Sequence, residues 1–177
     1  YQAVSGSGKD GVEELLQQSS AYIDQRSIDK KVYPKQIAFN SIPFVDCFLE
    51  NNYTREEMKM VWETHKILDE NISVNPTAVR VPVLVGHAES IYIETEKEID
   101  IELAKNCLNE FAGISVIDDV EEVDFPTSFE HGHGTDDVYV GRIRKGLSKN
   151  NSLNLWVVAD NVRKGAALNS IQIAENL

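Results

Sequence analysis

The chain has no long hydrophobic run and no leader of the secretory type. No segment approaches the roughly 20 consecutive apolar residues that a membrane-spanning helix needs, so we expect no membrane insertion. The first residues, YQAVSGSGKDG, are polar and glycine-rich, whereas a signal peptide would place basic residues before apolar ones. The chain also lacks an initiating Met, which predicts a fragment or a processed piece of a longer protein.

Cysteine and positive charge are scarce as well. The two cysteines, Cys47 and Cys107, are far apart, which favours unpaired thiols in a reducing compartment, and we expect the cytoplasm. Lys and Arg number 17 against 29 Asp and Glu, a net charge of −12, which argues against nucleic-acid binding through a basic face. An anionic small substrate would need a local group of Lys and Arg.

Helical and strand-like patterns follow one another with no repeat or linker between them. The spacing of apolar residues predicts helices over 11–23, 53–70, 99–111 and 160–177, and strands over 78–85, 90–96, 114–117, 136–145 and 153–160. Thr54 and Glu57 fit a capping box at the start of the second helix. Because neighbouring strands joined by short turns are antiparallel, we expect an α+β fold with a mixed, largely antiparallel sheet and helices on one face.

The stretch GSGKDG, residues 6–11, matches the dinucleotide-binding pattern G-x-G-x-x-G. That pattern should follow a buried strand, but only five residues precede it here. The favoured interpretation is a loop that begins a helix, although exposed amides at a helix start can also bind an anion.

Two charged pairs are candidates for a binding site. Glu56 and Lys59, three residues apart on a predicted helix, would ordinarily form an exposed ion pair. Arg80 and His87 are seven residues apart, which puts them on opposite faces of a regular strand. A bulge at Gly86 would bring them to one face, and the sequence leaves both arrangements open.

A metal site is the weaker interpretation of the stretch EHGHGTDD, residues 130–137. His131 and His133 lie close to Asp136 and Asp137, but the stretch is rich in glycine and no further ligand set is evident. We therefore predict no bound metal.

Neither cysteine has the setting of a nucleophile. Cys107 falls among the apolar positions of a predicted helix, where it would pack as a small hydrophobe. Cys47 lies between hydrophobic residues, without the cationic neighbours that lower the pKa of a thiol.

Several stretches together resemble one known family. In order along the chain, the motifs YQAVSGSGK, IAFNSIP, YTREEMKM, RVPVLVGHAES, VGRIR and LWVVADNVRKGAALNSIQIAE are similar to those of aspartate-semialdehyde dehydrogenase. The resemblance implies the glyceraldehyde-3-phosphate-dehydrogenase-like C-terminal fold. It also implies an NADP-dependent reductive dephosphorylation of aspartyl phosphate to aspartate semialdehyde, with release of phosphate, in a homodimer or homotetramer.

The resemblance also implies residue roles. His87 would be the catalytic acid and base, while Arg80 would bind the substrate carboxylate, Glu56 its ammonium and Lys59 the phosphate. Residues similar to those that line the nicotinamide end of the NADP site are Ser5, Gly6, Ser7, Gly8 and Asn161.

Two parts of the family pattern are missing from this chain. The nucleophilic cysteine, in an Asn-Cys motif, and the N-terminal NADP-binding domain would both precede residue 1. We therefore expect residues 1–177 to be a single C-terminal catalytic and dimerisation domain, inactive alone, whose 160–177 helix packs on the absent domain. The alternative is a non-catalytic homologue or a stand-alone dimerisation module.

Overall fold

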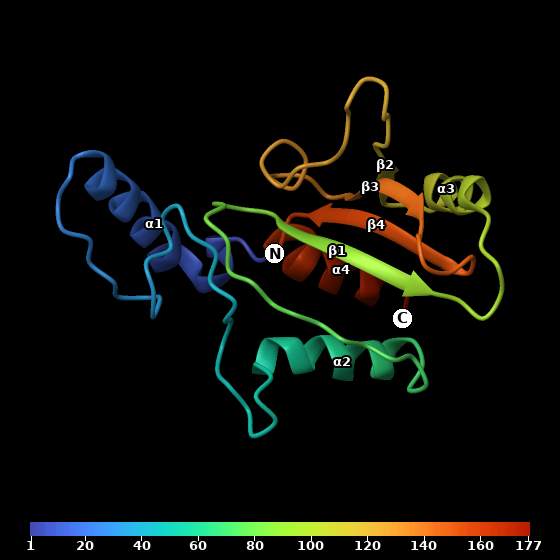
Figure 1. Ribbon diagram of the computed structural model, residues 1–177, viewed down its shortest axis with the longest axis horizontal. Coiled ribbons are helices and arrows are strands. Elements are labelled where there is room, and N and C mark those ends of the chain that lie inside the picture. The colour runs from blue at the N-terminus through green and yellow to red at the C-terminus, as the bar shows by residue number, and fades with distance from the viewer. The chain divides into compact units, whose positions relative to one another are not determined.

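The computed structural model describes residues 1–177 and divides into two compact units, Tyr1–Pro82 and Val83–Leu177 (Figure 1). Each unit is built around its own hydrophobic core. No helix combines the length and the hydrophobicity needed to cross a membrane. The prediction that residues 1–177 form a single domain stays a prediction.

The first unit contains the short 3-10 helix η1 (Val4–Ser7) and the helices α1 (Gly8–Ile23) and α2 (Arg55–Ile67). Its core gathers around one face of α1 and consists of Val4, Leu15, Tyr33, Ile37, Ala38 and Ile42. Gly11 lies where α1 is crowded, because a Cβ there would come within 2.6 Å of the Tyr33 hydroxyl. The predicted first helix is therefore confirmed, and it starts a few residues early.

Two buried polar side chains of α1 hold the irregular segment that follows it. The Glu14 carboxylate accepts hydrogen bonds from the backbone N–H groups of Lys31, at 2.9 Å, and Val32, at 2.5 Å. The Gln18 amide oxygen accepts from the N–H of Ile37 at 2.9 Å. These bonds satisfy buried backbone donors that have no helix or sheet partner.

The capping box predicted for α2 is present. The Glu57 N–H donates to Thr54 Oγ1 at 3.2 Å, and the Thr54 N–H donates to Glu57 Oε2 at 2.7 Å. The other oxygen of Glu57 accepts from the Ala78 N–H at 3.0 Å. The start of α2 is thereby tied to the segment that leads to Arg80.

The predicted strand over 78–85 is wrong. Arg80 instead makes isolated bridges, parallel to Gln2 and antiparallel to Ile42. Pro82, which has no N–H to donate, interrupts any longer ladder. Without that strand, the expected pairing of 78–85 with 90–96 does not form.

The second unit contains a four-stranded sheet in the order β1-β4-β3-β2, formed by β1 (His87–Glu94), β2 (Ile114–Val116), β3 (Val138–Lys145) and β4 (Ser152–Ala159). β4 pairs antiparallel with both β1 and β3, whereas β2 pairs parallel with β3. The predicted fold class, α+β with a largely antiparallel sheet, is confirmed.

Helix α3 (Ile101–Glu110) covers one face of this sheet through Ile101 and Leu108. The buried side chains beneath it come from the two central strands and are Val140, Ile143, Leu153 and Leu155. Leu153 and Leu155 alternate along β4 as expected of a sheet with one buried face. Val140 and Ile143 are three residues apart, because the register of β3 shifts between Gly141 and Arg144. The chain ends in the π-helix η2 (Arg163–Ala167) and α4 (Leu168–Glu175).

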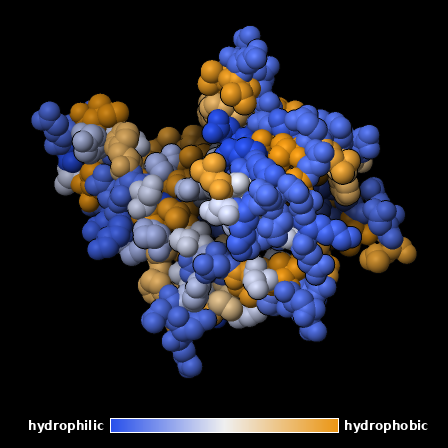
Figure 2. All heavy atoms as spheres, turned by 45° about the vertical axis from the view of Figure 1, so that its right-hand side comes forward, coloured by the Kyte–Doolittle hydropathy of each residue, from blue (hydrophilic) through white to orange (hydrophobic).

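Large hydrophobic side chains also reach the surface. In the second unit they include Phe111, Val120, Val123, Phe129, Ile171 and Ile173. Figure 2 shows hydrophobic side chains scattered among hydrophilic ones on the visible face. Such exposure is common singly, but patches of it mark surfaces that bind other chains.

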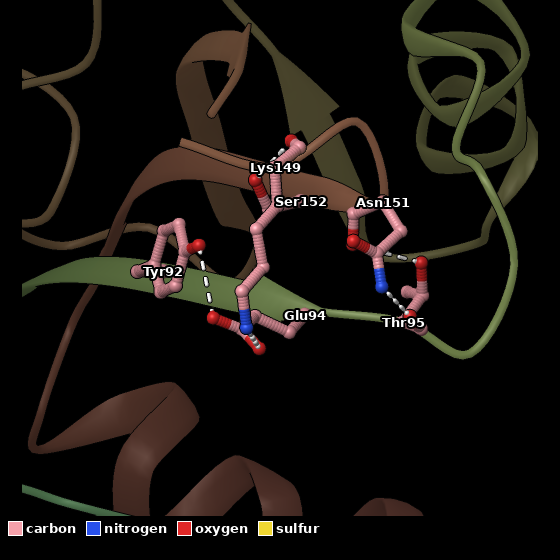
Figure 3. Close-up of polar contacts among 6 residues, drawn as sticks. All are labelled: Tyr92, Glu94, Thr95, Lys149, Asn151 and Ser152. Atoms are coloured by element: carbon pink, nitrogen blue, oxygen red, sulfur yellow. Dashed lines mark hydrogen bonds and ion pairs between the residues drawn. The ribbon is translucent and has the colours of Figure 1, made fainter. Parts of the chain in front are cut away.

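Polar contacts fasten the end of β1 to the start of β4 (Figure 3). Lys149 Nζ lies 2.6 Å from one oxygen of Glu94, whose other oxygen accepts from the Tyr92 hydroxyl at 3.0 Å. The Thr95 N–H donates to the Asn151 carbonyl at 2.9 Å. Strands far apart in the sequence therefore meet in a defined register.

Candidate functional site

The first unit gathers charged and polar side chains around Glu56, in the first turn of α2. Gln2 Nε2 donates to Glu56 Oε1 at 2.8 Å, and Lys59 Nζ lies 3.0 Å from Glu56 Oε2. Both oxygens of the carboxylate are therefore engaged. We refer to Gln2, Glu56, Lys59 and Arg80 as the Glu56 cluster.

Backbone contacts bring Gln2 and Arg80 to this place. The Gln2 N–H donates to the Val79 carbonyl at 2.8 Å, and the Val81 N–H donates to the Gln2 carbonyl at 3.0 Å. Arg80 is only 6% exposed, and its Nη1 donates to the Ala3 carbonyl at 2.7 Å. A buried guanidinium held in this way is fixed in orientation, as recognition of a carboxylate requires.

The electrostatics of the cluster keep its groups ionised. Burial alone would raise the pKa of Glu56, but the hydrogen bonds from Gln2 and Lys59, with the charges of Lys59 and Arg80, lower that pKa overall. The hydrogen bond to Glu56 raises the pKa of Lys59. Burial lowers the pKa of Arg80, which nevertheless stays a cation because a guanidinium does not lose its proton in proteins. Two cations thus accompany one carboxylate, an arrangement that suits an anionic or zwitterionic ligand.

The ion pair expected between Glu56 and Lys59 is present, and its two ends differ in exposure. The Glu56 side chain is 22% exposed and Lys59 45%, so only the lysine end lies well in solvent. Sequence reasoning missed Gln2 altogether. No spacing links residue 2 to residue 56, and only the tertiary structure brings them together.

In the second unit, His87 is the first residue of β1 and pairs with Ala159 near the end of β4. The preceding Gly86 is buried and has φ +92, a conformation that favours glycine. A Cβ at this position would lie 2.8 Å from the carbonyl oxygens of both Ser128 and Gly132. The backbone conformation and the close packing both require glycine immediately before His87.

The bulge expected at Gly86 does not form in a strand over 78–85, because that strand is absent. Arg80 belongs to the first unit and His87 to the second. Side-chain alternation along one strand therefore does not relate these two residues, and each is described within its own unit.

Two consecutive polar side chains after β4 bind loops near the start of β1. Asn161 Oδ1 accepts from the Gly86 N–H at 2.9 Å. Asp160 is 2% exposed; its Oδ2 accepts from the Gly134 N–H and its Oδ1 from the N–H groups of Val162 and Arg163, each at 2.8 Å. Burial would raise the pKa of Asp160, but these hydrogen bonds lower it overall.

The glycine-rich segment does not have the setting of a dinucleotide-binding fingerprint. Residues Val4–Ser7 form η1, and Gly8, at φ +75, begins α1. Residues 1–3 are not part of a strand, and Gln2 makes an isolated bridge to Arg80. The interpretation of this segment as a loop that begins a helix is therefore favoured.

His131, in the 130–137 stretch, is engaged with the protein. His131 Nδ1 accepts from the Thr127 N–H at 3.2 Å, and its ring lies 5.4 Å from that of Tyr139. No group of three or more His, Cys, Asp or Glu side chains in the structure is arranged to hold a metal ion. Cys47 and Cys107 are both unpaired and exposed, so the expectation that Cys107 packs inside is wrong.

Comparisons with known proteins point to one family. The sequence pattern described as "Semialdehyde dehydrogenase, dimerisation domain" matches residues 1–164. Aspartate-semialdehyde dehydrogenase of Shewanella violacea is 56% identical over 100% of this chain and 52% of its own length. The Bacillus subtilis protein of the same name is 45% identical over 100% of this chain and 54% of its own length.

Comparisons with solved structures point to the same family. Aspartate-semialdehyde dehydrogenase II of Vibrio cholerae complexed with ASA matches with a TM-score of 0.95 and 50% identity, over 99% of this chain and 52% of that one. The enzyme of Candida albicans with NADP matches with a TM-score of 0.61 and 26% identity, over 80% of this chain and 45% of that one. The chain spans about half the length of the relatives it matches.

Proposed function

Because the chain belongs to the family of semialdehyde dehydrogenase dimerisation domains, we propose that it is the catalytic and dimerisation half of an NADP-dependent aspartate-semialdehyde dehydrogenase. The resemblance seen in the sequence motifs is confirmed by the named relatives, whose matched part is about half of each protein. The parent protein would convert L-aspartyl 4-phosphate to L-aspartate 4-semialdehyde and phosphate, on the route to lysine, threonine and methionine. The observation that carries the proposal is the Glu56 cluster.

The cluster fits a substrate that carries a carboxylate, an ammonium and a phosphate. The planar fork of Arg80 would bind the carboxylate. Glu56 would attract the ammonium at lone pairs that Gln2 and Lys59 do not use, because a carboxylate has about four such sites. Lys59, the most exposed member of the ion pair, would meet the phosphate as a point charge.

His87 would move the proton in this reaction. An imidazole titrates near neutral pH, so it can take the proton of a nucleophilic thiol and return it when the tetrahedral intermediate collapses. The thiol would come from the part of the protein that precedes this chain. Cys47 follows Asp46, and Cys107, although it follows Asn106, lies within α3 and outside the stretches that resemble the family. The chain alone would therefore be inactive.

NADP would supply the hydride when bound, and this chain would contribute only to the nicotinamide end of its site. The residues proposed for that end are Ser5, Gly6, Ser7, Gly8 and Asn161. The small side chains of the 5–8 segment suit close approach of a flat ring.

Two further surfaces would be covered in the parent enzyme. We place a homodimer or homotetramer contact on the sheet of the second unit, supported by the description of the matching family as a dimerisation domain. The segment 160–177 would pack on the NADP-binding domain. The half-exposed side chains of Val162, Ile171 and Ile173 support this assignment.

The alternative of a non-catalytic module is less well supported. The curated relatives that match the whole chain at 45–56% identity are enzymes by name. Arg80, Glu56, Lys59 and His87 all lie in stretches that resemble motifs of the family. Such a module would have no need of two cations held beside one carboxylate.

The test is turnover by the full-length protein from the same gene, followed as phosphate-dependent reduction of NADP by L-aspartate 4-semialdehyde. Arg80→Lys keeps the charge but loses the fork, and we expect kcat/KM to fall about 10- to 100-fold. Arg55→Lys, an exposed position on α2, is the matched control. Equal kcat/KM in the two variants, or no turnover by the unaltered protein, would contradict the proposal.

A further inference from the structure

We propose that Asn161 is a positioning residue that sets the place of His87 through the backbone of Gly86. This inference rests on the proposed function, because it takes His87 to be the catalytic acid and base. It differs from a role for Asn161 in binding the nicotinamide, since here the side chain acts on the protein itself. All the groups involved belong to the second unit.

The first observation behind this inference is a hydrogen bond between Asn161 and Gly86. Asn161 Oδ1 accepts the Gly86 N–H at 2.9 Å, between residues 75 positions apart in the sequence. Gly86 is the last residue before β1. The position of its amide therefore sets where the strand begins and where the His87 side chain projects from it. Without this acceptor, a part-buried N–H would lose its protein partner.

The second step is the crowding on the other side of Gly86. The carbonyl oxygens of Ser128 and Gly132 leave no room for a Cβ at Gly86, whose N–H is held by Asn161 Oδ1. Asp160 holds the same loop through the Gly134 N–H at 2.8 Å. The Asp160–Asn161 pair thus fixes two segments around the residue that precedes His87.

The consequence is kinetic. General acid–base catalysis depends on placing the imidazole within hydrogen-bonding reach of the proton it moves. A displacement of about 1 Å costs roughly 100-fold in rate. Asn161 would therefore be needed for kcat, in addition to any contribution that it makes to the KM for NADP.

A double-mutant cycle in the full-length protein tests this. We expect Asn161→Ala to lower kcat about 10- to 100-fold and to speed hydrogen exchange of the Gly86 amide. Asn161→Asp, which keeps an acceptor oxygen, should restore amide protection and raise kcat above that of Asn161→Ala. Asn109→Ala, at an exposed position of α3, is the control.

The decisive comparison is in a His87→Ala background, where Asn161→Ala should lower kcat no further. Equal losses with and without His87, or a raised KM for NADP at unchanged kcat, would overturn the inference and leave the proposed function standing. If His87→Ala itself retains normal turnover, the proposed role of His87 fails and the inference falls with it. If Asn161→Ala does not fold, failure of Asn161→Asp to protect the Gly86 amide overturns the inference.

Discussion

Replacing Glu56 by Gln separates the proposed binding role of this carboxylate from any structural role. The substitution keeps the size and shape of the side chain, and its remaining oxygen can still accept the hydrogen bond from Gln2. It removes the charge that pairs with Lys59 at 3.0 Å and that would attract the ammonium of the substrate. The substitution thus loses both the ion pair with Lys59 and the attraction to the substrate ammonium, but the two losses of free energy differ in size.

The cost to stability should be small. The lysine end of the pair is 45% exposed, so water and salt screen the interaction. Pairs of this kind contribute about 0–1 kcal/mol to the free energy of unfolding. A hydrogen bond between a substrate ammonium and a carboxylate contributes about 1.5–3 kcal/mol. This range corresponds to a fall in kcat/KM of roughly 10- to 100-fold.

The assay compares kcat/KM for L-aspartate 4-semialdehyde with denaturant unfolding of the same full-length protein. Glu63→Gln is the matched control, because Glu63 is an exposed carboxylate on the same helix whose charge also acts on Lys59. We expect Glu56→Gln to lose activity while its unfolding midpoint stays close to that of the control. Activity within about twofold of Glu63→Gln would refute the assigned role. So would a loss of several kcal/mol in stability, since misfolding would then explain the lost activity.

Further predictions concern both units of the full-length protein. His87→Ala should lower kcat about 100- to 10,000-fold, measured at saturating substrate, with an unchanged far-ultraviolet spectrum. Gly86→Ala should destabilise the fold by about 1–3 kcal/mol in denaturant unfolding, because of its positive φ and the two carbonyl oxygens 2.8 Å from the new Cβ. Glu14→Ala should cost about 1–3 kcal/mol for each backbone donor left without an acceptor; an unchanged midpoint would contradict this. Because folding lowers the pKa of Asp160, its contribution to stability is complete above the ordinary carboxyl pKa of about 3.9 and is lost as the pH falls through the lower folded value. In Asp160→Asn, the free energy of unfolding should therefore fall less steeply with acidification than in the unaltered protein. The same slope in both proteins at acidic pH would contradict this prediction.

Local signals in the sequence predicted most of the helices and the β3–β4 pair. The capping box of Thr54 and Glu57 depends on atoms three residues apart, so its residue types were enough to place the start of α2. The β3 and β4 segments are joined by a short polar turn, and they pair antiparallel as expected. The motifs also indicated the family, which the comparisons confirm.

Local sequence signals could not predict the pairing partner of β1 or the neighbours of Arg80. A strand pattern shows which residues alternate but not which distant strand they meet, and β1 pairs with β4 rather than with a preceding strand. Arg80 was expected in a strand, yet it lies between Gln2 and Ile42 in isolated bridges. No residue type or spacing distinguishes that outcome from a short edge strand.

The sequence by itself determined most of the helices, the Thr54–Glu57 capping box, the fold class and the family, because these follow from contacts between near neighbours and from the order of motifs. Only the tertiary structure decided that Gln2 joins Glu56, that Arg80 is buried, and that Asn161 holds Gly86. The physical reason is that each of these contacts closes a long loop of chain. Such contacts form only where the packing of whole elements brings the partners within hydrogen-bonding distance.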